Sequence, residues 1–111
     1  MGITDWSSVA KSQKIDNTGE VIGGFTIATE VTVAGWTFNN TSTAATVTFY
    51  EPTAVSLGSN PAVPSASGTV SFVLQIPANS TVTFKAPHIK YKDGLFAKTS
   101  ANTCTGTVWY E

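Results

Sequence analysis

The sequence predicts an all-β protein: a single-domain antiparallel β-sandwich, jelly-roll-like, of about seven to nine short strands. Apolar and polar residues alternate with a period of two over residues 70–76 and 80–86. This period puts Val70, Phe72, Leu74 and Ile76 on one face of a strand. Turn residues recur at short intervals, and no stretch has helical periodicity. A sheet with one apolar face must be covered by a second layer, which favours the sandwich.

The N-terminal third contains an arm, a turn and an irregular strand. Residues 1–14 are polar apart from isolated apolar residues, so we expect an N-terminal arm or edge strand, with the sandwich domain spanning 15–111. Residues 17–19 (Asn-Thr-Gly) form a turn. Val31 and Val33 then share one face, whereas Trp36 and Phe38 continue in the opposite parity. This one-residue slip predicts a β-bulge at 34–35, with Gly35 as the bulged residue.

The rest of the chain reads as strands separated by turns and one long loop. Residues 39–43 turn the chain into a strand at 45–50. Residues 52–68 hold three prolines and two glycines and predict a long loop, either a contact loop or a disordered tip. After the 70–76 and 80–86 strands, Pro87 makes a corner into a strand at 89–92. The turn dipeptide at 93–94 leads to strands at 95–99 and 104–111.

Charge is scarce, and this argues against several classes of partner. Only 12% of the 111 residues are charged, and all six basic residues are lysines. Nucleic-acid binding depends on clustered positive charge, so we expect none. No stretch approaches the ~20 apolar residues of a membrane span. The chain begins without a recognisable secretory signal and has one cysteine, Cys104, so we expect assembly in a reducing cytosol.

No residue pattern predicts catalysis, a metal site or a cofactor. His88 is the only histidine and lies at a turn, where a hydrogen-bonded or exposed side chain is favoured over a general base. One histidine and one cysteine do not make a zinc site. A calcium site using Asp16 or Asp93 is not supported by any acidic loop. We interpret Cys104 as a small strand residue.

Three lysines, Lys85, Lys90 and Lys92, lie close together around Pro87. They are either solvated edge positions that discourage aggregation, which is the favoured interpretation, or an anion site.

The aromatic residues divide into a predicted core and a predicted surface. The predicted core aromatics follow the apolar parity and are Trp36, Phe38, Phe49, Phe72, Phe84 and Tyr110. The predicted partner-interface residues lie on otherwise polar faces or, for one, in the N-terminal arm, and are Trp6, Tyr50, Val73 and Trp109. Such residues fit a subunit interface or a sugar-stacking platform, or are covered by the chain itself.

Several segments resemble small all-β virion proteins of tailed bacteriophages. The resemblance is carried by a Ser/Thr strand and corner (76–84), a Gly-Leu-aromatic strand (89–98) and a final strand with the sequence Thr-Gly-Thr-Val-Trp-Tyr-Glu (105–111). A central hairpin (37–42 and 45–51) is also similar.

The resemblance implies a non-enzymatic capsid decoration, or cement, protein. It would be a homotrimer that binds the major capsid protein and stabilises the phage head, within a virion assembled in the bacterial cytoplasm. The alternatives are a carbohydrate-binding module and a receptor-binding subunit of a head or tail fibre.

Overall fold

The computed structural model describes residues 11–53 and 62–111, and within them the chain is entirely β. The strands are β1 (Lys11–Ile15), β2 (Glu20–Val21), β3 (Val31–Asn40), β4 (Ala45–Glu51), β5 (Thr69–Ile76), β6 (Ser80–Tyr91), β7 (Phe96–Thr99) and β8 (Cys104–Tyr110). The boundary predicted between residues 14 and 15 falls inside β1, which is an outer strand of a sheet.

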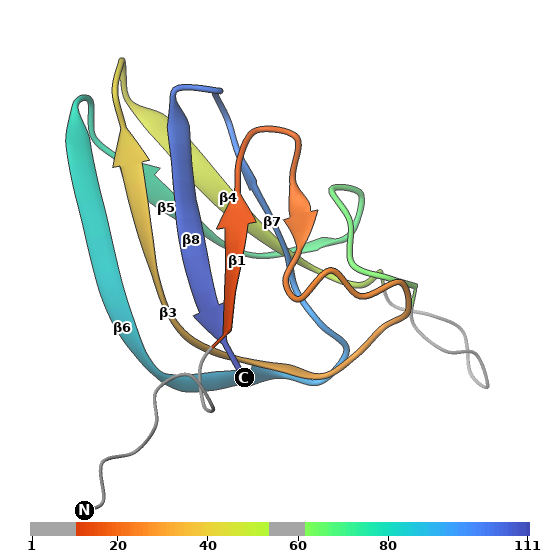
Figure 1. The fold of residues 1–111 in the computed structure, drawn as a ribbon. Helices are drawn as coiled ribbons and strands as arrows, with labels where there is room; N and C mark the ends of the chain where they lie inside the picture. Colours follow the sequence, from red (N-terminus) through yellow and green to blue (C-terminus); the bar gives the residue numbers. More distant parts are fainter. Residues whose placement is uncertain (1–10, 54–61) are drawn as a thin grey trace, which may run out of the picture.

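The strands form two four-stranded antiparallel sheets in the order of a jelly roll (Figure 1). The first sheet is β1-β8-β3-β6 and the second is β2-β7-β4-β5. The ladder pairs β1 with β8, β2 with β7, β3 with β6 and β4 with β5, as in one long hairpin rolled around itself. Contacts of β3 with β8 and of β4 with β7 close the roll. The predicted sandwich is therefore confirmed, and the structure adds its strand order.

The predicted bulge in β3 is present. Val33 is aligned with Tyr110 and Gly35 with Trp109, so Ala34 is the extra residue against β8. Against β6 the irregularity is larger, because Gly35 is aligned with Lys85 and Val33 with Ile89. The bulge lets β6 continue past Pro87 as one strand, so the prediction of two separate strands at 80–86 and 89–92 was wrong in this respect.

The core lies between the sheets and is formed by the inward rows of both. Its buried apolar residues are Ile15, Ile22, Val31, Val33, Trp36, Phe38, Ala45, Val47, Phe49, Ile76, Leu95, Ala97, Cys104 and Val108. Each of the larger aliphatic or aromatic side chains contributes about 1.5 to 3 kcal/mol by leaving water. Seven of these buried residues belong to β3 and β4, each of which has a neighbouring strand on both sides.

One buried polar side chain ties two turns to this core. Asn40 is almost fully buried at the end of β3, and its Nδ2 donates to the carbonyl oxygens of Thr43 (2.7 Å), Ile76 and Pro77. Its Oδ1 accepts from the Ser42 amide. Because every polar atom of this amide is satisfied, its burial fixes the β3–β4 turn against the end of β5.

The predicted core aromatics are not equally buried. Trp36, Phe38 and Phe49 are enclosed, and Phe72 and Tyr110 are half-buried against them. The prediction for Phe84 was wrong, because 43% of its side chain is exposed although it stacks on Trp36 with ring centroids 4.8 Å apart. Phe84 lies on β6, the outer strand of its sheet, which has a neighbouring strand on one side only.

A second irregularity changes the face of Val70. From Ala45 to Phe49, β4 is in regular register with β5, and Phe49 is aligned with Phe72. The next residue, Tyr50, is aligned with Val70, so Ser71 is an extra residue in β5. Val70 is therefore 51% exposed beside Tyr50, and the prediction that it continues the row of Phe72 and Leu74 was wrong.

Candidate interaction surfaces

The residues predicted to form a partner interface do not all lie on one surface. Tyr50 and Val73 belong to β4 and β5 and share the outer face of the second sheet. Trp109 belongs to β8 and lies on the outer face of the first sheet, on the opposite side of the sandwich. Trp6 lies outside the described residues.

Apolar side chains gather around Tyr50 on the outer face of the second sheet. The Tyr50 and Phe96 rings are 5.9 Å apart and tilted by 60°. Val70 is aligned with Tyr50 across the ladder, and Val73 with Thr48, one step further along the same face. Val70 and Val73 are 51% and 46% exposed. We call Tyr50, Phe96, Val70 and Val73 the Tyr50 patch.

The sequence predicted two of the four residues of the Tyr50 patch, Tyr50 and Val73. Phe96 and Lys98 lie on the same face because side chains alternate along a strand. The position of Phe96 on the outer face could therefore be predicted from the strand expected at 95–99. The exposure of Val70 could not be predicted from the sequence, because the bulge at Ser71 moves this residue from the inward row to the outer face.

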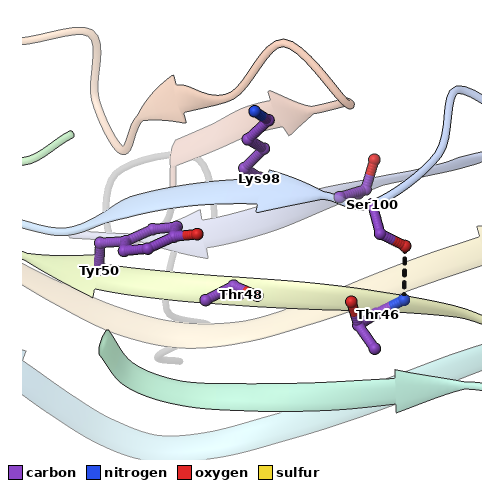
Figure 2. A pocket seen from close by; sticks show the side chains of 6 residues that line it. Thr46, Thr48, Tyr50, Lys98 and Ser100 are labelled. Atoms are coloured by element: carbon purple, nitrogen blue, oxygen red, sulfur yellow. Dashed lines mark hydrogen bonds between the residues drawn. The ribbon is translucent and has the colours of Figure 1, made fainter. Parts of the chain in front are cut away.

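A shallow depression of about 170 Å³ adjoins the patch along β4 and β7 (Figure 2). Its lining residues are Thr46, Thr48, Tyr50, Lys98, Thr99 and Ser100. The Thr46 amide donates to Ser100 Oγ at 2.9 Å, which holds one end of the depression closed (Figure 2). The volume is below the ~300 Å³ of ordinary small-molecule pockets, so this surface favours contact over enclosure of a ligand.

The outer face of the first sheet is covered by hydroxyl-bearing residues. The Thr37 and Thr83 hydroxyls share a hydrogen bond of 2.8 Å across β3 and β6, and Thr81 Oγ1 donates to Asn39 Oδ1 at 2.9 Å. Trp109 is half-buried on this face, aligned with Gly35 of β3. Because glycine has no side chain, β3 presents none opposite Trp109 at this aligned pair.

The lysine-rich corner sits at the outer strand of the first sheet. Lys85 and Lys90 belong to β6, and Lys90 Nζ is 4.0 Å from a carboxylate oxygen of Glu30. His88 has a left-handed backbone (φ 63°), and its exposed Nδ1 contacts Glu111 Oε2. An acidic partner beside Lys90 fits a solvated edge better than an anion site.

Neither Asp16 nor Cys104 is placed for chemistry. The Asp16 carboxylate accepts hydrogen bonds from the hydroxyl and amide of Thr18, which lower its pKa below the ordinary value and fix the β1–β2 turn. Cys104 is buried in the core, and burial raises the pKa of its thiol. Across residues 11–53 and 62–111, no three His, Cys, Asp or Glu side chains come together as a metal site would require.

Comparisons with known proteins give little beyond this geometry. No protein-family profile and no curated protein matches the chain. One solved structure that it resembles comes from work reporting that Bacillus endospore appendages form a novel family of disulfide-linked pili. The two share 18% identity at a TM-score of 0.45, over 92% of this chain and 79% of the other, and no conclusion is drawn from so distant a likeness. The described part of the chain has no helix long and apolar enough to cross a membrane.

Proposed function

We propose that this chain is a non-enzymatic structural subunit of a bacteriophage particle. It acts as a decoration protein that binds the major capsid protein and stabilises the head. The observation that carries the proposal is the Tyr50 patch, where two valines expose about half of their side chains beside two aromatic rings. Aromatic and aliphatic groups at the centre of a polar surface are typical of protein interfaces.

The surroundings of the patch suit repeated contact with a shell. Thr46 and Thr48 continue β4, and uncharged residues make up all of β5. Threonine hydroxyls cost less to desolvate than lysine or glutamate side chains, so a partner can cover the part of this face formed by Thr46, Thr48 and β5 at little cost. A ligand that binds only the assembled shell stabilises it by mass action, by about 2.7 kcal/mol at 100 times its Kd.

Binding to expanded capsids of the phage that encodes the chain tests the proposal. The wild-type protein is expected to cosediment with capsids and raise their melting temperature. Tyr50→Ala, which removes the aromatic centre of the patch, is expected to weaken binding at least about tenfold. Thr81→Ala on the opposite sheet serves as the matched control and is expected to bind like wild type. Capsids that neither bind the protein nor melt at a higher temperature would exclude this function.

Carbohydrate binding is the second candidate, favoured by the depression beside Tyr50. An aromatic ring next to several hydroxyls and an ammonium group is a possible sugar-stacking arrangement (Figure 2). A glycan array distinguishes the two functions. Binding of a glycan that is lost in Tyr50→Ala but kept in Tyr50→Phe, without capsid binding, would favour the carbohydrate module.

A further inference from the structure

The four outer strands of the two sheets are protected to different degrees. An outer strand presents unpaired backbone N–H and C=O groups, and proteins usually guard it with charge, proline, bulges or short length. β1 carries Lys11 and Lys14, and β2 is two residues long with Glu20. β6 carries two lysines, Pro87 and the irregularity opposite Ala34.

β5 has much less protection than the others. Its eight residues, Thr-Val-Ser-Phe-Val-Leu-Gln-Ile, include no charge, no proline and no glycine. Its one irregularity, at Ser71, lies near its first end, so five successive residues from Phe72 to Ile76 remain in regular register with β4. Within the described residues β5 pairs with β4 alone. The strand is about 26 Å long at ordinary strand rise, enough for several interchain hydrogen bonds.

We propose that β5 pairs with β5 of a second copy, in antiparallel orientation about a two-fold axis. The second sheets of the two copies then form one eight-stranded sheet. An isologous contact of this kind joins two copies and leaves no free interface, so it predicts a dimer. The resemblance to phage virion proteins implies a trimer instead. The inference concerns the isolated protein and does not rest on capsid binding.

The uncharged sequence of β5 is the reason that the partner is a second copy. When a strand pairs antiparallel with its own copy, residues on either side of the two-fold axis face each other. A strand whose charges all have one sign then places like charges close together, which is destabilising. β1 and β6 would bring their lysines together in this way, whereas β5 brings only apolar and neutral groups together.

The faces of the sheet restrict the register, and the exposure of Val73 selects one of the registers that they allow. A two-fold axis normal to the sheet keeps outer residues on the outer face, so a residue of β5 must meet one that points the same way. With Val73 opposite its own copy, Phe72 meets Leu74 on the inner face. A β-branched pair then covers the 46%-exposed Val73. The contact is small for a dimer, so we expect reversible association with a Kd on the order of micromolar.

Charge substitution at Val73 tests the proposal by sedimentation equilibrium of the isolated protein. The wild type is expected to have twice the mass of the chain. Val73→Lys and Val73→Glu, which place equal charges on the two-fold axis, are each expected to sediment as monomers with unchanged circular dichroism. An equimolar mixture of the two variants is expected to restore the dimer. Thr83→Lys adds the same charge to β6 and is expected to remain dimeric.

Other results would overturn the proposal. A wild-type monomer or trimer is incompatible with a two-fold β5 contact, as is a Val73→Lys variant with the wild-type mass. A mixture that stays monomeric refutes the register. Loss of the dimer on removal of residues 1–10, with the fold retained, would assign the contact to that segment. Capsid binding by a monomeric wild-type protein would overturn the dimer and leave the proposed function standing. A wild-type dimer that does not bind capsids would do the reverse, so the two proposals can fail separately.

Discussion

Replacing Phe49 and Phe84 in turn tests whether the sandwich is open along β5 and β6. Phe49 is fully buried and stacks on Phe72, with centroids 4.3 Å apart. Phe49→Ala should therefore lower the free energy of unfolding by about 4 kcal/mol, the cost typical of an enclosed phenylalanine. Phe84 buries little more than half of its side chain and leaves no enclosed cavity when truncated. Its partial burial and its stacking on Trp36 predict a loss of about 1.5 to 2 kcal/mol.

Urea denaturation followed by circular dichroism measures both losses. The variants are best compared in the Val73→Lys background, so that association through β5 does not contribute. If Phe49→Ala fails to fold, the pair Phe49→Leu and Phe84→Leu gives the same order with smaller losses. Equal losses at the two positions would refute the reasoning, because Phe84 would then be covered in solution by another part of the protein.

Three further predictions concern single positions. Gly106→Ala should cost about 2 kcal/mol or more in thermal or urea unfolding, because its Cβ would lie 2.2 Å from the Thr37 carbonyl oxygen. Cys104 should resist maleimide in the native protein and react at once in denaturant, since the thiol is buried and its pKa is raised. Asp16, whose pKa is lowered, should contribute stability that is present above its ordinary value of 3.8 and lost as the pH falls through the lower folded value. The melting temperature of Asp16→Asn should therefore fall less than that of wild type in this acidic range, and an identical fall would contradict the role of Asp16.

Local pattern predicted most of the strands because alternation is a property of neighbouring residues. The bulge at 34–35 could be predicted because the apolar residues change from odd positions, up to Val33, to even positions, from Trp36 onward. The bulge in β5 could not be predicted, because the apolar and polar residues alternate without a break through Val70 and Phe72. Only the register with β4 shows the extra residue. Pro87 suggested a strand break, but the extra length of β6 opposite Ala34 accommodates it.

Properties that depend on strand order could not be predicted. Phe84 has the sequence pattern of a core residue, yet its exposure follows from the outer position of β6, which is set by pairing with residues far away in the chain. The same holds for the candidate interface. Alternation placed Tyr50 and Val73 on polar faces, but the separation of Trp109 from them depends on which sheet each strand joins.

The Tyr50 patch owes its composition to one extra residue. If the register of β4 and β5 continued unchanged from Phe49, the residue opposite Tyr50 would be Ser71, and Val70 would remain in the inward row. The bulge replaces this serine with Val70, so an apolar side chain stands beside the Tyr50 ring on the outer face. Bulges that redirect side chains in this way are often found at functional positions. An exposed valine gives no benefit to an isolated sandwich, because burying it in the core would stabilise the fold by about 1.5 kcal/mol or more. That cost is understandable if the outer face of the second sheet is covered when the protein performs its function.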